Sequence, residues 1–170
     1  MDRKELFGSY KGDCKIFFET GTHHGDSVQT ALDLGFDKVI SVEIVDSFYE
    51  ECVERFKDVL GTKVFLFKGN SIELMDSMLD LVDAKCMFWI DAHDTEGELP
   101  AYIELTKIKE HNITDSIIIV DDIPVYFYNF NILSLMLSSI NSNYEIKLVD
   151  ALNENNGDIY PNYRAVAFLE

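Results

Sequence analysis

The sequence predicts a single α/β domain: a seven-stranded, mostly parallel sheet between two layers of helices, closed by an antiparallel C-terminal hairpin. Five short apolar runs alternate with segments whose apolar residues recur at helical spacing, which is typical of strands joined by crossover helices. Two further apolar runs near the C-terminus are separated only by the polar loop 151–162, whose length permits a hairpin. At 170 residues, the chain (1–170) has the size of one domain.

The expected elements follow one another in a regular order. Residues 1–13 are polar and are expected to form a short helix or arm on the edge of the domain. The expected strands are residues 16–18, 38–43, 64–68, 86–91, 117–122, 144–149 and 164–169. The expected helices are residues 26–34, 46–60 and 72–79, one that begins at Pro100, and one through residues 132–140. In open α/β sheets, ligands bind beyond the carboxyl ends of the strands, so the residues that follow each strand are site candidates.

The composition disfavours several classes of protein. A formal net charge of -17 argues against a nucleic-acid substrate, because affinity for phosphates rests on Lys and Arg, although a local basic patch would permit one. No apolar run approaches the roughly 18 residues of a membrane span, and the chain starts without an apolar signal region. Of the three cysteines, Cys14 and Cys86 lie in or beside expected buried strands, which indicates core residues in a reducing compartment. We expect a cytoplasmic protein with no membrane partner.

A glycine-containing turn follows the first strand. Glu19 at the strand end is followed by Gly21 and Gly25 and then by a helix, which gives the spacing E-x-G-x-x-x-G-x-S. Glycines permit a tight turn close to a ligand, and the start of a helix offers free N–H groups. The spacing differs from the G-x-G-x-x-G of dinucleotide-binding turns, and a carboxylate suits a ligand with ammonium and sulfonium centres better than a pyrophosphate. In the simpler alternative, Glu19 is a helix acid and the glycines only form a turn.

This turn resembles the first motif of class I S-adenosylmethionine (SAM) methyltransferases, in the variant found in small sugar and antibiotic O-methyltransferases. The resemblance extends over nearly the whole chain, because that family has a Rossmann-like, seven-stranded sheet of the kind expected here. It implies that the cofactor is bound by turn residues, namely Glu19, Gly21, Thr22, His24, Gly25 and Ser27. His23 and His24 would line the methionine end of that pocket.

Polar residues also end the second and third strands. Glu43 is placed to accept hydrogen bonds from both ribose hydroxyls of a nucleoside, a role that nicotinamide-binding domains share. Asn70 and Ser71 stand where the resemblance implies an Asp-Ser or Asp-Ala pair that binds the adenine edge. Asn70 departs from the commoner Asp but still offers a carbonyl oxygen. It also suits the cap of the following helix, and the two roles are compatible.

Three carboxylates end the fourth and fifth strands: Asp91, Asp121 and Asp122. Without a counter-charge they would raise one another's pKa, and a hard divalent cation removes that cost. Oxygen ligands favour Mg²⁺, Mn²⁺ or Ca²⁺ over zinc. The pattern resembles metal-dependent O-methyltransferases of the macrocin and catechol type, which implies a metal site at these three residues, with Asp91 also near the cofactor. Alternatively, Asp121 and Asp122 cap a turn and Asp91 faces solvent.

The loop after the fourth strand contains the candidate base. His93 follows Asp91 by two residues, so on an extended backbone both side chains would leave the same face. We expect His93 to act as a general base with Asp91 as the second catalytic residue; a metal or substrate contact and a plain surface histidine are the alternatives. Asp94 is the next candidate base. The aromatic segment 126–130 either walls the acceptor site or belongs to the core, and the core is favoured.

Together these features predict a SAM-dependent methyltransferase that acts on a hydroxyl of a small molecule, such as a sugar or a catechol-like diol, with help from Mg²⁺ or a similar ion. Residues 1–13 and loops 92–99, 122–130 and 151–162 would select the acceptor. The alternatives are a metal-free N- or O-methyltransferase, a SAM- or nucleoside-binding module without catalysis and, least favoured, a nicotinamide oxidoreductase. A homodimer is left open.

Overall fold

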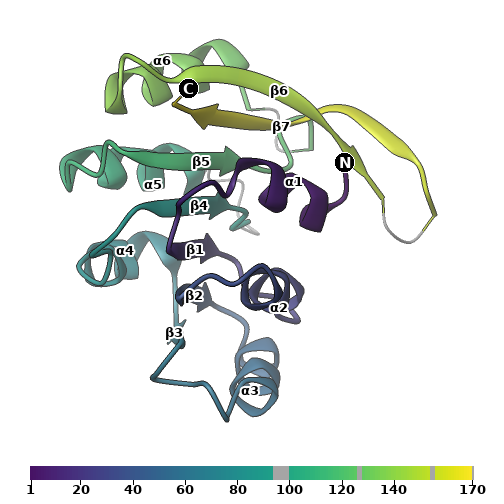
Figure 1. Cartoon of the computed structure of the whole chain (residues 1–170), viewed down its shortest axis with the longest axis vertical. Coiled ribbons are helices and arrows are strands. Elements are labelled where there is room, and N and C mark those ends of the chain that lie inside the picture. Colours follow the sequence, from purple (N-terminus) through teal and green to yellow (C-terminus); the bar gives the residue numbers. More distant parts are fainter. Residues whose placement is uncertain (94–99, 126–127, 154–155, 170) are drawn as a thin grey trace.

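The sheet has the predicted architecture. A computed structural model describes residues 1–93, 100–125, 128–153 and 156–169. Its strands form one seven-stranded sheet in the order β3-β2-β1-β4-β5-β7-β6 (Figure 1). β7 runs antiparallel to both of its neighbours, and the remaining described strand pairs are parallel. The expected fold, a mostly parallel sheet with an antiparallel C-terminal hairpin, is therefore confirmed.

Strands and helices alternate along most of the chain. The strands are β1 (Ile16–Thr20), β2 (Lys38–Glu43), β3 (Val64–Lys68), β4 (Cys86–Ile90), β5 (Ser116–Val120), β6 (Glu145–Leu152) and β7 (Ile159–Phe168). The helices are α1 (Arg3–Tyr10), α2 (Asp26–Asp33), α3 (Asp46–Arg55), α4 (Ser71–Leu79), α5 (Pro100–Glu110) and α6 (Phe130–Ile140).

Helices cover both faces of the sheet and enclose two apolar clusters (Figure 1). Side chains alternate between the faces along each strand, so the neighbours Phe17 and Phe18 enter different clusters. One cluster packs α1, α2 and α3 against the sheet, and the other packs α4, α5 and α6. The central strands β1, β4 and β5 are buried along their whole length, which accounts for the apolar runs in their sequences.

Two elements end elsewhere than the sequence predicted. The helix expected over residues 46–60 ends at Arg55, because the backbone of Phe56 leaves helical geometry and the chain continues in turns. The C-terminal hairpin is longer than expected. Its ladder continues through the pairs Ala151–Tyr160 and Leu152–Ile159, so the connecting loop shrinks to residues 153–158.

The N-terminal segment is a capped helix that is anchored in the core. The Asp2 carboxylate accepts a hydrogen bond from the Glu5 backbone N–H at 2.7 Å, and the Glu5 carboxylate accepts one from the Asp2 backbone N–H at 3.3 Å. Leu6 and Phe7 are fully buried, and the Phe7 ring meets the Trp89 ring with 5.0 Å between centroids. The first turn of α1 lies at the edge of the sheet where the parallel strands end (Figure 1).

The strand order places several loops at that same edge. The order reverses between β1 and β4, and a crevice for ligands forms at such a point. The residues that follow β1, β2, β4 and β5 therefore meet there. Within the residues that the structure describes, no helix is long and apolar enough to cross a lipid bilayer.

Candidate active site

The two glycines of the turn after β1 are required for different structural reasons. Gly21 adopts a positive φ of 88°, and a Cβ there would lie 2.9 Å from the Asp91 carbonyl oxygen, so the turn presses against the chain after β4. Gly25 has φ 78°, and its Cβ would lie 2.6 Å from the Phe56 ring. Gly25 is thus required by packing against the end of α3, while Gly21 brings the β1 and β4 ends together.

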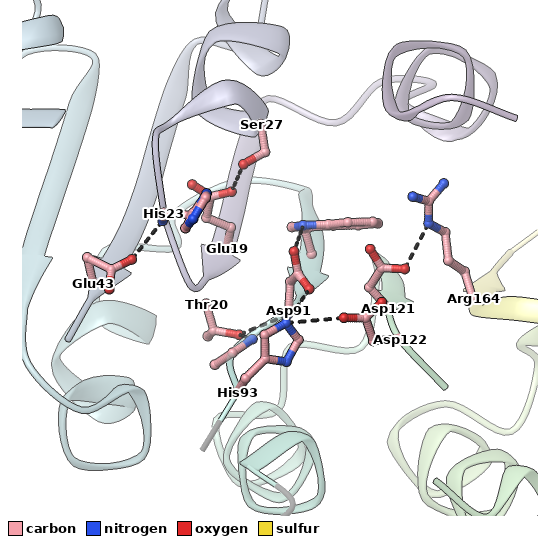
Figure 2. A network of polar contacts seen from close by, with 12 residues as sticks. Glu19, Thr20, His23, Ser27, Glu43, Asp91, His93, Asp121, Asp122 and Arg164 are labelled. Atoms are coloured by element: carbon pink, nitrogen blue, oxygen red, sulfur yellow. Dashed lines mark hydrogen bonds and ion pairs between the residues drawn. The ribbon is translucent and has the colours of Figure 1, made fainter. Parts of the chain in front are cut away.

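Glu19 lies beneath the turn rather than on its surface. Its side chain is fully buried and accepts a hydrogen bond from the Ser27 hydroxyl (Figure 2). It accepts a second one from the Ser41 hydroxyl at 2.7 Å. Burial raises the pKa of Glu19 to about 7, and the two serine hydrogen bonds oppose that shift. Glu19 therefore ties the turn to α2 and β2 from below. It occupies a supporting position, one step away from the expected contact with a cofactor.

Glu43 is held in place by backbone N–H groups. One carboxylate oxygen accepts from the His23 N–H at 2.7 Å and the other from the Val45 N–H at 2.8 Å. His23 itself has a positive φ of 50°, and its ring packs on Phe48 with 4.3 Å between centroids. Glu43 is only 6% exposed, so its orientation is fixed before any ligand arrives. A carboxylate has about four lone-pair sites, and two of them remain for a ligand.

The structure shows the capping role of Asn70, and the adenine contact of Asn70 and Ser71 stays a prediction. The Asn70 side chain caps α4 by accepting a hydrogen bond from the Ile72 N–H at 2.9 Å. Both residues also lie on the wall of a cavity of about 500 Å³. The cap engages the side-chain oxygen, which was the atom expected to meet the adenine.

This first cavity collects most of the residues proposed for the cofactor. Those on its wall are Gly21, Thr22, Ser27, Glu43, Asn70, Ser71 and Asp91. Three others lie elsewhere. Glu19 is beneath the turn, Gly25 is covered by Phe56, and His24 turns away to pair with Glu51 at 2.9 Å. His23, the neighbour of His24, does line the cavity.

An acidic cluster forms where β4 and β5 end. The His93 Nε2 lies 3.4 Å from Asp91 Oδ1 and 3.2 Å from Asp122 Oδ2 (Figure 2). One potential ligand atom from each of these three residues lies within 4.8 Å of the others. The Trp89 indole N–H donates to Asp91 Oδ2 at 3.1 Å. Burial, together with the charges of Asp121 and Asp122, raises the pKa of Asp91 well above its usual range.

The adjacent acids Asp121 and Asp122 point in different directions. Asp121 accepts a hydrogen bond from Arg164 Nε at 2.9 Å, and the Arg164 guanidinium also lies over the Trp89 ring at 5.2 Å (Figure 2). Asp122 has φ 55°, a left-handed conformation that is uncommon for non-glycine residues. Burial would raise the pKa of Asp122, but hydrogen bonds from His93 and Tyr163 outweigh it and lower the pKa. Of the three acids expected to hold a metal, Asp121 therefore pairs with Arg164, whereas Asp91 and Asp122 lie beside His93.

The premise of that metal prediction, acids without a counter-charge, was therefore wrong for Asp121. Arg164 is 6% exposed and supplies the missing charge from β7, 43 positions along the chain. The sequence carried one signal for it, because Arg164 begins an otherwise apolar run. In the structure, His93 takes the third place in the cluster beside Asp91 and Asp122.

A second buried acid lies under the cluster and was not predicted. Thr20 Oγ1 donates to Glu104 Oε2 at 3.2 Å and lies within hydrogen-bonding distance of the Asp91 and Ala92 N–H groups, at 3.2 and 3.3 Å. Glu104 is fully buried, and among the described residues its Oε1 has no hydrogen-bond partner. Burial raises the pKa of Glu104 to about 7. Its signal in the sequence is an acid on the apolar stripe of α5, beside Leu105.

A second cavity, of about 480 Å³, adjoins the first. The two share Arg3, Thr22, His23, Asp121 and Asp122 on their walls. The second cavity is closed on its far side by the β6–β7 hairpin, which contributes residues 151–153, Tyr160, Tyr163 and Arg164. The Tyr160 and Tyr163 rings are stacked, with 5.3 Å between centroids.

Part of the loops expected to select an acceptor lies outside the described residues. This applies to residues 94–99, which include Asp94, and to residues 126–127 and 154–155. In the described part of the aromatic segment 126–130, Tyr128 is 8% exposed and belongs to the apolar cluster under α5 and α6.

Comparisons of sequence yield no relative. The chain matches no protein-family model. No curated protein sequence matches it either.

Comparisons of structure show which fold the chain has. It is similar to the O-methyltransferase TomG from Streptomyces achromogenes, solved with SAM: the TM-score is 0.64 at 13% identity, over 99% of this chain and 78% of that one. An O-methyltransferase from Bacillus cereus, solved with S-adenosylhomocysteine (SAH), gives a TM-score of 0.65 at 12% identity, over 98% and 78%. The tRNA methyltransferase TrmK from Bacillus subtilis gives a TM-score of 0.65 at 18% identity, over 99% of this chain and 65% of that one. The fold is thus that of class I SAM-dependent methyltransferases, and the similar structures include O-methyltransferases and a tRNA methyltransferase.

Proposed function

We propose that this protein is a SAM-dependent methyltransferase that acts on a hydroxyl group of a small molecule. The observation that supports it best is the junction of two cavities at the acidic cluster. Asp122 lies on the walls of both cavities and 3.2 Å from His93. A group transfer needs a donor and an acceptor on either side of the transferred group, and two adjoining cavities offer that arrangement.

The first cavity would hold the cofactor. Glu43, oriented by two backbone N–H groups, would accept the ribose hydroxyls, and Asn70 and Ser71 would lie beside the adenine. The cofactor's sulfonium end would then extend past Gly21 toward Asp91, because the strand order runs β3-β2-β1-β4. A nicotinamide dinucleotide is disfavoured, because its pyrophosphate would meet a turn that has a buried acid, Glu19, directly beneath it.

In the reaction, the carbon–sulfur bond of the donor breaks as a carbon–oxygen bond to the acceptor forms, and the hydroxyl proton must go to a base. His93 is the candidate, with Nδ1 as the atom that takes the proton, because its Nε2 lies at the acidic cluster and already donates to Asp122. Asp91 and Asp122 flank that nitrogen and would stabilise the imidazolium that results. The chemistry asks for positioning more than for covalent help.

A divalent cation would fit the same cluster. Two carboxylates and an imidazole with ligand atoms within 4.8 Å of one another are a plausible donor set, whereas Asp121 is engaged by Arg164. When bound, Mg²⁺ or Mn²⁺ would lower the pKa of an acceptor hydroxyl and orient it. His93 as a ligand and His93 as the base exclude one another, and a metal-free enzyme remains the alternative.

The second cavity would hold the acceptor. Its volume of about 480 Å³ suits a small molecule, and most of the described residues on its wall are polar. The net charge of -17 disfavours RNA, which needs cationic surface. A sugar or a catechol-like diol fits these limits.

Calorimetric titration tests the cofactor. SAM and SAH should bind at micromolar affinity, and NAD should not bind. SAH release in the presence of hydroxyl acceptors is then measured at increasing chelator concentrations. A loss of rate indicates the metal-assisted reaction, and an unchanged rate indicates the metal-free one. Binding of SAM without SAH release for any acceptor would instead favour the binding module, and tight NAD binding would contradict the proposal.

Thermal shift with Mn²⁺ tests the ligand set. A cation that binds only the folded protein raises its melting temperature by mass action. The shift should be lost in Asp122→Asn and kept in Glu54→Gln, whose residue lies on α3 away from the cluster. A shift of the same size in all three proteins would remove the metal from the proposal.

A further inference from the structure

The walls of the first cavity carry an unequal set of charges. Four of the described lining residues are acids, namely Glu43, Asp91, Asp121 and Asp122, whereas Arg3 is the only described Lys or Arg among them. SAM has two positive centres, the sulfonium and the α-ammonium, and one negative α-carboxylate. The acids suit the positive centres. Arg164 already neutralises Asp121, but a carboxylate that enters the field of the other acids still needs a cation within a few ångströms.

Arg3 lies at the end of the cavity that this carboxylate would reach. Along the sheet, the wall runs from Asn70 after β3, past Glu43 after β2, to Gly21 after β1 and Asp91 after β4. A ligand whose ribose lies at Glu43 and whose sulfonium lies near Asp91 therefore places its amino-acid tail beyond the Gly21 turn. Arg3 is on that side, and it lines both cavities where they join.

The electrostatic effects of Arg3 on two nearby acids agree with this position. The positive charge of Arg3 contributes to a lower pKa at Asp26 in the first turn of α2, after the larger effect of Arg55. It also opposes the rise in the pKa of Glu19 beneath the turn. Asp26 itself is paired with Arg55 at 2.8 Å.

The backbone of Arg3 is fixed before a ligand binds. Arg3 is the first residue of α1, directly after the Asp2 cap that bonds to Glu5. One turn later, Leu6 and Phe7 are fully buried in the core. A cation on a pre-ordered helix loses less conformational freedom on binding than one on a loose arm.

We propose that Arg3 binds the α-carboxylate of the cofactor, and that α1 thereby makes this cavity select nucleosides with a free amino-acid carboxylate. This inference rests on the proposed function. The planar guanidinium can donate two parallel hydrogen bonds to a carboxylate, which a lysine ammonium cannot reproduce. The N-terminal residues, which the sequence analysis assigned to acceptor selection, would instead select the cofactor.

Two ligands that differ only in this carboxylate test the proposal: SAH and decarboxylated SAH, titrated by calorimetry into the 170-residue chain. The parent should prefer SAH by about ten- to a hundredfold, as for a hydrogen bond to a charged group. Arg3→Gln should lose most of that preference by weakening SAH alone, and Arg3→Lys should keep part of it. Lys4→Gln, an exposed neighbour on the same helix, should behave as the parent.

The remaining outcomes separate this inference from the proposed function. If the parent binds neither ligand, the proposed cofactor is wrong and the inference falls with it. If the parent binds SAH but Arg3→Gln weakens both ligands equally, or neither, the cofactor stands and the role of Arg3 is overturned. Melting temperatures of the Arg3 variants within a few degrees of the parent exclude a loss of folding, and Arg3→Lys keeps the charge if Arg3→Gln unfolds.

Discussion

The two halves of the sheet hold their site residues by different means. After β2 and β3, the polar side chains are held by main-chain groups: Glu43 by the N–H groups of His23 and Val45, and Asn70 by that of Ile72. After β4 and β5, side chains hold side chains, as Arg164 holds Asp121. A main-chain donor survives almost any substitution of the residue that carries it. The cofactor half should therefore tolerate change in its supporting residues, whereas the acidic half should not.

The largest effect should come from the junction itself. His93→Ala should lower kcat by about 10²–10⁴-fold, because a positioned base contributes that much, and should leave SAH binding nearly intact. Raising the pH should restore part of the rate. The matched control is His111→Ala, measured in the same SAH-release assay, because His111 lies near Asp76 and Asp80 and is on the wall of neither cavity. Equal kcat in His93→Ala and parent at pH 7 would place the base elsewhere.

Removing the counter-charge should destabilise the acidic half. Arg164→Met leaves the Asp121 carboxylate buried without its partner, and breaking such a pair typically costs about 3–5 kcal/mol of unfolding free energy. Urea denaturation of the apo protein measures this. The double variant Asp121→Asn with Arg164→Met should recover part of the loss. If the single and double variants are equally stable, the ion pair does not support this half.

The buried acid beneath the cluster should make stability depend on pH. The pKa of Glu104 is raised to about 7, so the native state favours its uncharged form. Stability is then greatest at low pH and declines as the pH rises from about 4.5 through 7. The contribution is at most roughly 3 kcal/mol. Glu104→Gln should reduce this slope between pH 5 and pH 8 in denaturant titrations without abolishing it, because the pKa of Glu19 is also raised to about 7. Glu110→Gln, exposed on the same helix, should leave the slope unchanged.

The smallest of these effects concerns the half that main-chain groups support. Glu43→Ala removes a charged acceptor for ribose hydroxyls, and SAH affinity should fall by about ten- to a hundredfold with little change in melting temperature. Glu51→Gln, an exposed acid on α3, is the control in the same calorimetric titration. An unchanged SAH affinity in folded Glu43→Ala would move the ribose away from β2.

The same contrast explains what could be predicted from the sequence. Strand ends and turns are local, so the positions of Glu43 and Asn70 at the ends of β2 and β3, and the order of the elements, followed from periodicity and spacing. The division of Asp121 from Asp122 depends on a φ of 55° and on an arginine 43 positions away, and neither is visible in a local pattern. Glu104 was missed because it recurs at the same helical spacing as the apolar core residues of α5. That spacing does not show that one of the buried positions is an acid.

The C-terminal hairpin has a consequence for the order in which the molecule forms. β7 is the last described strand to leave the ribosome, yet it lies between β5 and β6 and delivers Arg164 to Asp121. Until it arrives, the nascent chain has an open β5 edge beside a carboxylate that still lacks its partner. Pairings of such long sequence separation form late. Assembly of the acidic half therefore has to wait for β7, whereas the β1–β3 half can pack earlier, while β4 to β7 are still being made.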